Sequence, residues 1–307
     1  MDQTNHSMRT LTRRAYAKVN LALAVGRVSG VDGGGLHPIC SWMHAIELWD
    51  EIEIRRLCEN QESIYALGWK QSEGEDKPVE WDQESDLAVR AHKLIEAHVG
   101  RKLGVQIRVS KSIPAGGGLG GGSSDGAAVL MGIDELFRLR LDHAAIVGLA
   151  MELGSDVPFF LDPKRSIPRP AMVQGVGDQI TRLKPNLQGT PITLILPGFG
   201  CPTGRVFQIF DEQVSPGHRC DSQRVAELIQ QESIDEDALF NDLESASCCA
   251  DGRLGALKDA IGRAIGRSVH VSGSGSTLFV IGSIGPAESA LIVESTPGCR
   301  VVGARLC

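Results

Sequence analysis

The feature that most constrains this chain is a run of glycines near its middle. Six of the seven residues from Gly116 to Gly122 are glycine, Pro114 precedes them, and Ser123, Ser124 and Asp125 follow where a helix is expected to begin. Because glycine tolerates positive φ and has no side chain, such a loop can bring several backbone N–H groups to one ligand. A helix N-terminus adds about half a positive charge. The stretch therefore predicts a phosphate-binding loop.

Two well-known phosphate-binding patterns do not fit. The P-loop requires Gly-Lys-Ser/Thr, which the sequence lacks. The Rossmann pattern fits Gly116, Gly118 and Gly121 after a strand expected at residues 105–109, but residues 112–115 intervene. A flexible glycine linker would need neither the proline before the loop nor the serines after it. A third kind of phosphate loop has to be considered.

Composition narrows the class of protein. At 307 residues the chain suits two domains better than one and can bury a large core. Its formal net charge of -7 argues against general nucleic-acid binding, which requires a basic surface. The eight cysteines include no C-x-x-C pair and no signal peptide is recognisable, so free thiols in a reducing cytoplasm are expected. No apolar run approaches the roughly 18 residues of a membrane span. We expect a soluble cytoplasmic protein with neither nucleic acid nor a membrane as a partner.

Periodicity predicts both strands and helices. Alternating apolar residues predict a strand from Thr12 onward, with Lys18 and Asn20 on one face. Residues 43–57 are interpreted as two strand segments, and residues 221–265 as mainly helical. These patterns indicate mixed strand and helix without fixing the topology.

Two aspartates precede expected helices. Asp86 stands before Leu87 and a helical pattern, and Asp156 stands before a short helix expected near Pro158. Either side chain could simply cap its helix by accepting a backbone N–H bond. From the residues alone, a capping role and a chemical role for Asp156 stay equally open.

The loop and its surroundings resemble a known family. Lys111-x-Ile113-Pro114 and the stretch from Gly118 to Asp125 resemble the phosphate loop of the GHMP small-molecule kinases. Within that family the chain is most similar to the enzymes that act on 4-diphosphocytidyl-2-C-methyl-D-erythritol, an intermediate of non-mevalonate isoprenoid biosynthesis. Three further stretches resemble motifs of the same family, at residues 17–21, 152–159 and 272–277.

The resemblance implies a fold and an activity. The fold is α+β, with a GHMP kinase domain at residues 1–163, a second at residues 164–307, and the active site in the cleft between them. The activity is ATP-dependent phosphorylation of the 2-hydroxyl of that cytidine-diphosphate-linked alcohol, a step of terpenoid precursor synthesis.

The resemblance also implies the cofactors, which are ATP and Mg²⁺. Ser124 is expected to help to hold the Mg²⁺ that accompanies the nucleotide. The residues expected to cradle the ATP phosphates are Pro114, Gly116, Gly117, Gly118, Leu119, Gly120, Gly121, Gly122, Ser123 and Ser124.

Five residues outside the loop are implied as site residues. Asp156 is expected to accept the proton of the substrate hydroxyl, and Lys18 to stabilise the developing negative charge. Asn20, His37 and Phe207 are expected to contact the substrate, the last two at the cytosine.

Two neighbouring stretches complete the expected substrate site. Leu36 stands where the family has a tyrosine that stacks on the cytosine. Residues 202–207 are expected to form a loop on the substrate side.

Two other functions remain open from the sequence. A GHMP kinase for mevalonate or homoserine would share the loop and Asp156 but would not need His37 and Phe207. A non-catalytic nucleotide sensor would bind ATP without turnover, although Lys18 and Asp156 argue against it. The sequence leaves open whether the protein is a monomer or a homodimer.

Overall fold

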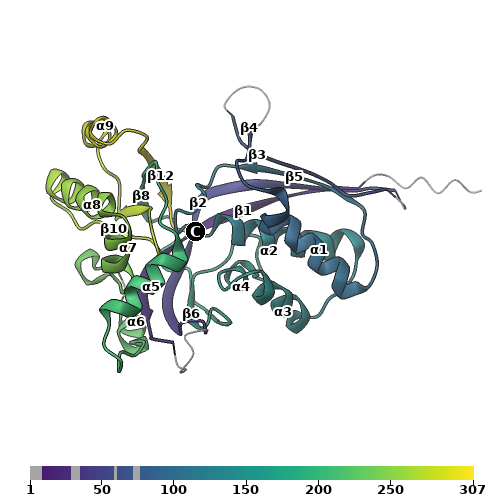
Figure 1. The fold of residues 1–307 in the computed structure, drawn as a ribbon, viewed down its shortest axis with the longest axis horizontal. Coiled ribbons are helices and arrows are strands. Elements are labelled where there is room, and N and C mark those ends of the chain that lie inside the picture. The colour runs from purple at the N-terminus through teal and green to yellow at the C-terminus, as the bar shows by residue number, and fades with distance from the viewer. Residues whose placement is uncertain (1–8, 29–34, 59–60, 72–76, 232) are drawn as a thin grey trace, which may run out of the picture. The chain divides into compact units, whose positions relative to one another are not determined.

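The structure is a computed structural model that describes residues 9–28, 35–58, 61–71, 77–231 and 233–307 (Figure 1). The chain forms two compact units. The first unit comprises the chain up to Tyr16 together with Trp49–Ile113 and Gly121–Ser166, and the second comprises Ala17–Leu48, Pro114–Gly120 and Ile167–Cys307. Two long strands, β1 (Thr10–Val25) and β2 (Ile39–Arg56), contribute residues to both units. The predicted α+β class is confirmed.

The strands of the first unit follow the order β4-β3-β5-β2-β1. The three that belong wholly to this unit are β3 (Ile64–Trp69), β4 (Lys77–Pro78) and β5 (Val105–Lys111). β5 pairs antiparallel with β2 and parallel with β3. Val105, Ile107 and Val109 are buried, whereas Gln106 and Arg108 between them are not, as a strand with one covered face requires.

The interpretation of residues 43–57 as two strand segments was wrong. β2 runs unbroken through Trp49 and Asp50. A buried aspartate usually interrupts a strand because its carboxylate needs partners. Here the carboxylate accepts the backbone N–H groups of Ser112 and Ile113 and pairs with Lys111, so the strand continues.

Helices cover one side of these strands (Figure 1). They are the 3₁₀ turn η1 (Gln83–Ser85) and the helices α1 (Leu87–Val99), α2 (Gly121–Phe137), α3 (His143–Leu153) and α4 (Val157–Phe160). Asp86 caps α1 by accepting the Ala88 N–H at 2.9 Å, as the sequence indicated. α1 ends at Gly100, where φ is 67°.

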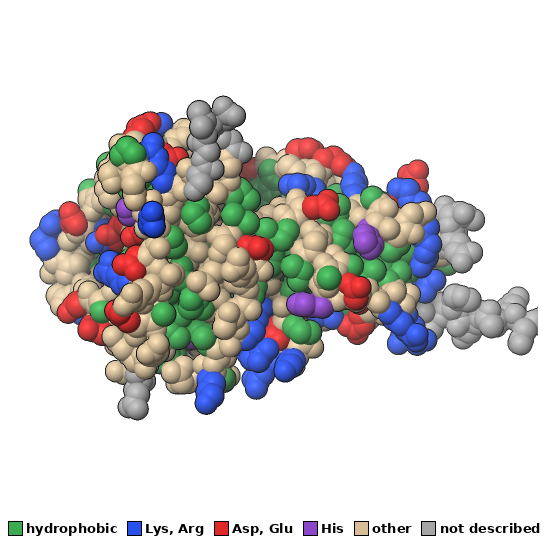
Figure 2. Space-filling view, turned by 90° about the horizontal axis from the view of Figure 1, so that it is seen from below, with side chains coloured by type: hydrophobic (Ala, Val, Ile, Leu, Met, Phe, Trp, Pro, Cys, Tyr) green, Lys and Arg blue, Asp and Glu red, His purple; other side chains and the backbone are tan. Residues whose placement is uncertain are grey.

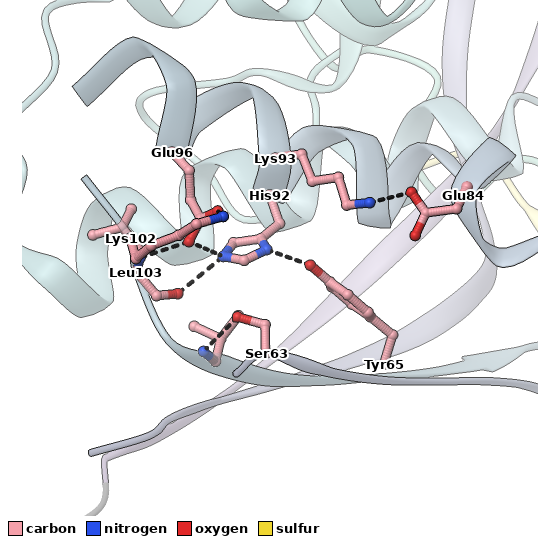
Figure 3. A network of polar contacts seen from close by, with 9 residues as sticks. Ser63, Tyr65, Glu84, His92, Lys93, Glu96, Lys102 and Leu103 are labelled. Atoms are coloured by element: carbon pink, nitrogen blue, oxygen red, sulfur yellow. Dashed lines mark hydrogen bonds and ion pairs between the residues drawn. The ribbon is translucent and has the colours of Figure 1, made fainter. Parts of the chain in front are cut away.

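A buried polar network ties α1 to the strands (Figure 3). The Tyr65 hydroxyl donates to His92 Nδ1 at 2.7 Å, and His92 Nε2 donates to the Leu103 carbonyl at 2.9 Å. The Leu103 N–H in turn donates to Glu96 Oε1 at 2.7 Å. This order of donors requires a neutral ring, and burial lowers the pKa of His92 in agreement. The network fixes the C-terminal half of α1.

The second unit contains a four-stranded antiparallel sheet in the order β10-β11-β8-β12. Its strands are β8 (Pro191–Leu196), β10 (His270–Val271), β11 (Leu278–Ile281) and β12 (Arg300–Arg305). A separate hairpin of β6 (Ala171–Gly175) and β7 (Gln179–Arg182) pairs with β2, and β9 (Phe240–Asn241) pairs with β1.

The helices of the second unit are α5 (Thr203–Gln213), α6 (Ser222–Ile229), η2 (Glu236–Ala238), α7 (Glu244–Ala250), α8 (Gly252–Ile265) and α9 (Pro286–Ser295). Of these, α5, α7, α8 and α9 contribute side chains to one hydrophobic core. Phe210 of α5, Leu254 of α8 and Ile195 of β8 are among the buried side chains that form this core. The prediction that residues 221–265 are mainly helical is confirmed.

The surface is mixed in charge. On the face in Figure 2, Lys and Arg lie interspersed with Asp and Glu among uncharged side chains. Within the part of the chain that the structure describes, no helix is both long enough and apolar enough to cross a membrane.

Candidate active site

The first half of the glycine loop lies in the second unit, and its backbone requires glycine at particular positions. φ is 67° at Gly116, 74° at Gly118 and 68° at Gly120. Gly118 is also the point of closest approach, because a Cβ atom there would lie 2.1 Å from the carbonyl oxygen of Ser272. A side chain at Gly118 would therefore displace either the loop or the segment that contains Ser272.

Two segments of the second unit, residues 17–21 and 272–277, converge on this loop and together donate three hydrogen bonds to its backbone carbonyls. The bonds run from Lys18 N–H to Leu119 O (2.9 Å), from Ser272 Oγ to Gly118 O (3.1 Å) and from Thr277 N–H to Gly117 O (3.1 Å). Two of the stretches that resemble family motifs, residues 17–21 and 272–277, therefore meet the glycine loop in space. The loop is held through its carbonyl side.

A small cavity of about 180 Å³ lies beside the loop in the second unit. Its lining includes Pro114, Gly117, Gly200, Ser276 and Thr277. The walls are mostly backbone and small side chains, a surface that can approach a compact anion closely.

Lys18 and Asn20 lie on one face of β1, as predicted. Lys18 Nζ donates to Asn20 Oδ1 at 2.5 Å, and Asn20 Nδ2 donates to Ser41 Oγ at 2.8 Å. Ser41 Oγ in turn donates to the Ala22 carbonyl at 2.8 Å. Both Lys18 and Asn20 are buried, so these bonds fix their orientation. A Cβ at Gly273 would lie 3.3 Å from Lys18 Nζ, which places the stretch at residues 272–277 against them.

Asn241 holds the start of the stretch at residues 272–277 in place. Its Nδ2 donates to the carbonyls of Val271 and Gly273, at 2.9 and 2.7 Å. The adjacent Asp242 accepts the Val25 N–H at 2.9 Å, and burial raises its pKa. Asn241 and Asp242 therefore join β1 to the segment that contacts the glycine loop.

His37 and Phe207 lie together in the second unit. Their ring centroids are 4.6 Å apart, and His37 Nε2 lies 3.1 Å from Asp211 Oδ2. Phe207 and Asp211 are four residues apart on α5, so one face of that helix contacts the imidazole on two sides. Leu36 is 65% exposed.

The expectation of a loop at residues 202–207 was wrong, because α5 begins at Thr203. The apolar residues Val206, Ile209 and Phe210 recur at helical spacing and are buried. Phe207 is thus carried by a helix, and Pro202 is its N-cap residue.

The second half of the loop lies in the first unit, where α2 begins at Gly121, two residues before Ser123. Gly122, Ser123 and Ser124 occupy its first turn, and Ser124 is buried. The N–H groups of such a turn have no partner within the helix and favour an anion.

A cluster of buried charges lies next to this helix start. Lys111 Nζ lies 2.6 Å from both Asp50 Oδ2 and Asp125 Oδ2. Burial alone would lower the pKa of Lys111, but the carboxylates of Asp125 and Asp50 outweigh it and raise that pKa. In the sequence, Lys111 and Asp125 are recognisable only as parts of a motif. Asp50 was not predicted, because it is 61 residues from Lys111 in the chain.

Asp156 lies in the first unit at the N-cap position of α4, as the capping interpretation proposed. Its side chain makes no capping hydrogen bond there. The helix start therefore does not account for this aspartate.

Comparison with known proteins agrees with these motifs. Residues 86–162 match the model of the GHMP kinases N terminal domain. A 4-diphosphocytidyl-2-C-methyl-D-erythritol kinase of Thermobifida fusca is 36% identical over 289 residues, which cover 92% of this chain and 88% of the relative. An enzyme of the same name from Citrifermentans bemidjiense is 34% identical over 276 residues, which cover 89% of this chain and 89% of the relative.

Solved structures give the same picture. A crystal structure of 4-(cytidine 5'-diphospho)-2C-methyl-D-erythritol kinase matches with a TM-score of 0.69 and 29% identity, covering 96% of this chain and 99% of the other. A homoserine kinase from Cytophaga hutchinsonii shares the fold at a TM-score of 0.65 and 17% identity, covering 99% of this chain and 98% of the other. The chain belongs to the GHMP kinases, which are ATP-dependent small-molecule kinases, and among them to the family of 4-diphosphocytidyl-2-C-methyl-D-erythritol kinases.

Proposed function

We propose that this kinase transfers the γ-phosphoryl group of ATP to the 2-hydroxyl of 4-diphosphocytidyl-2-C-methyl-D-erythritol. The observation that carries the proposal is the convergence of two motif stretches, residues 17–21 and 272–277, on the glycine loop within the second unit. The names of relatives more than 30% identical over most of the chain supply the substrate.

The glycine loop is the proposed phosphate site. Its carbonyls at Gly117, Gly118 and Leu119 are bonded to neighbouring segments, so we assign phosphate binding to its N–H groups. Close backbone approach at Gly118 and a buried Ser124 in the first turn of α2 fit a bound polyphosphate.

Mg²⁺ is the proposed metal, held by the nucleotide with help from the Ser124 hydroxyl. Among the described residues no group of three or more His, Cys, Asp or Glu side chains could hold a metal ion. A divalent ion bound mainly through substrate phosphates needs few protein ligands, which fits a single hydroxyl.

Proton transfer is assigned to Asp156 and charge stabilisation to Lys18. The substrate hydroxyl must lose its proton as the bond to phosphorus forms, and a positioned carboxylate can accept it. Lys18 is held by Asn20 on a rigid strand, as a group that stabilises developing charge has to be. The proposal draws on residues of both units.

Recognition of the cytosine is assigned to His37 and Phe207, with Asn20 contacting the substrate beside Lys18. Because the carboxylate of Asp211 accepts a hydrogen bond from His37 Nε2, the ring presents Nδ1 to a ligand. Phe207 supplies an aromatic face next to it. Leu36 gives an apolar side chain where the family has an aromatic one.

Three further expectations stay proposals. They are a cytoplasmic location, a monomeric or homodimeric state, and folding domains that divide after residue 163.

A substrate panel tests the proposed function. ADP release with Mg-ATP is measured for 4-diphosphocytidyl-2-C-methyl-D-erythritol, mevalonate and homoserine. We expect kcat/KM for the first to exceed the others by more than about 10⁴, because a site built for polar groups rejects analogues that lack them. A preference for mevalonate or homoserine would replace the proposed substrate, and nucleotide binding without any turnover would indicate a sensor.

A further inference from the structure

The buried cluster of Asp50, Lys111 and Asp125 has no part in the proposed chemistry. All three belong to the first unit, and none of the three side chains is more than 3% exposed. Taking three charged groups out of water is costly unless they are paired and bonded. A cluster of this kind needs a reason for its presence.

Its place in the chain supplies one. Lys111 is the last residue of β5, on the N-terminal side of the glycine loop, and Asp125 lies in α2 on its C-terminal side, 14 residues on. Asp50 in β2 also accepts the N–H groups of Ser112 and Ile113, the latter at 2.8 Å. The cluster therefore joins the two segments that enter and leave the loop to a central strand.

The hydrogen bonds are unevenly divided between the two carboxylates. Asp50 accepts from Lys111 and from two backbone N–H groups. Asp125 accepts from Lys111 alone, and its Oδ1 is buried without a hydrogen-bond partner in the described structure. One cation can neutralise one anion in a buried site, and Asp50 has more hydrogen-bond donors than Asp125 to stabilise a negative charge.

We propose that Asp50 is ionised against Lys111, that Asp125 is a neutral carboxylic acid, and that the cluster positions the glycine loop for nucleotide binding. Asp50, Lys111 and Asp125 are thus positioning residues. For its effect on nucleotide affinity the inference rests on the proposed function.

The electrostatics agree with this assignment. Burial raises the pKa of Asp125 well above its usual range, and the nearby charge of Asp50 raises it further, against the opposing effect of Lys111. A neutral group at Asp125 leaves the cluster without net charge.

Isosteric variants of the full-length protein test the charge assignment. Asp125→Asn replaces a neutral acid with a neutral amide, so Mg-ADP affinity measured by calorimetry should stay within about threefold of the wild type. Asp50→Asn removes the anion that holds Ser112 and Ile113, and should weaken Mg-ADP binding by about tenfold or more. Asp50→Asn should still fold, because Asp125 can ionise and pair with Lys111.

The double variant Asp50→Asn/Asp125→Asn gives a sharper readout. It leaves Lys111 with no carboxylate, so its unfolding midpoint in urea should fall by more than the sum of the two single variants. Glu135→Gln removes a carboxylate from the same helix that pairs with Arg13 and not with Lys111, and as the control it should leave Mg-ADP affinity unchanged.

Infrared spectroscopy examines the proton directly, without any nucleotide. The wild type at neutral pH should show the carbonyl band of a protonated, buried carboxylic acid, and Asp125→Asn should lose it. Four results would each overturn the charge assignment. The first two are absence of that band and an Asp125→Asn protein that binds Mg-ADP as weakly as Asp50→Asn. The others are additive losses of the unfolding midpoint in the double variant and an Asp50→Asn chain that does not fold. Unchanged Mg-ADP affinity in Asp50→Asn would overturn the positioning role. A wild type that binds no nucleotide would instead refute the proposed function and leave the infrared result standing.

Discussion

At the scale of single residues, Asp156 carries the largest share of the proposed chemistry. Asp156→Asn keeps the size of the side chain but cannot accept a proton, so kcat should fall by about 10²- to 10⁴-fold while KM for ATP changes little. Steady-state ADP release measures both constants, and an unchanged thermal midpoint serves as the folding control. Near-normal kcat in a folded variant would remove Asp156 from the role of general base.

Asp211 is expected to act through His37. In Asp211→Asn the amide can donate as well as accept, so the imidazole loses its fixed tautomer. KM for the cytidine-linked substrate should rise about tenfold, with kcat and KM for ATP nearly unchanged.

Glu212→Gln, one position further along α5, is the matched control because Glu212 is exposed and pairs only distantly with Arg205, at 3.9 Å. Equal effects of the Asp211 and Glu212 variants would show that charge on the helix, and not the contact with His37, is responsible. The tautomer of His37 can be observed separately by ¹⁵N nuclear magnetic resonance.

His44 predicts a pH dependence of stability. It is fully buried, neither ring nitrogen has a hydrogen-bond partner in the described structure, and burial lowers its pKa to about 3. The pKa of His44 is lower in the folded than in the unfolded state. Its contribution to stability is therefore fully present above about pH 6.5 and is lost as the pH falls towards 3.

In that window the unfolded state binds one more proton at His44, which costs about 1.4 kcal/mol per pH unit. His92 and His270 shift in the same direction and add to the slope. The free energy of unfolding should therefore be measured with urea at about pH 7, 6 and 5. Plotted against pH, it should have a shallower slope in His44→Gln than in the wild type, by the equivalent of about one proton. Identical slopes would mean that His44 can take up a proton in the folded state.

Side-chain partners of this kind could not be predicted from one sequence. Lys18 and Asn20 were placed on one face because a strand has a period of two residues. Asp50 and Asp211 were missed, because their partners lie 61 and 174 positions away. Local patterns carry no information about such contacts.

At the scale of elements, the glycine loop gives the clearest prediction. Gly118→Ala introduces a Cβ that would lie 2.1 Å from the Ser272 carbonyl, at a φ that costs an alanine about 1–2 kcal/mol. The loop must shift, so KM for ATP should rise about tenfold or more. Gly148→Ala in α3 is the control, since nothing lies within 4 Å of its Cβ and alanine favours a helix. An unaffected Gly118→Ala enzyme would show that the phosphates do not depend on this backbone.

The two mistaken elements have a common cause. Trp49-Asp50 in β2 and Pro202 to Gly204 at the start of α5 look like breaks when only local preferences are considered. In the structure Asp50 finds buried partners, and Pro202 is an N-cap residue, a position that tolerates proline. Tertiary contacts keep β2 continuous at Asp50, and the N-cap position allows α5 to begin directly after Pro202.

At the scale of the whole molecule, the order of motifs along the chain differs from their grouping in space. Residues 17–48 and 114–120 group with residues 167–307 in the second unit. The predicted domain boundary after residue 163 stays a prediction about folding, and limited proteolysis with identification of the stable fragments would test it. Cleavage confined to other segments would count against that boundary.

The most direct test of the central claim is the product of the reaction. ³¹P nuclear magnetic resonance of a mixture of the enzyme, Mg-ATP and 4-diphosphocytidyl-2-C-methyl-D-erythritol should show ADP and an equal amount of a new phosphomonoester on the 2-hydroxyl. Unchanged ATP, or ADP accompanied only by free phosphate, would contradict the account, because the phosphoryl group would not have reached the proposed alcohol.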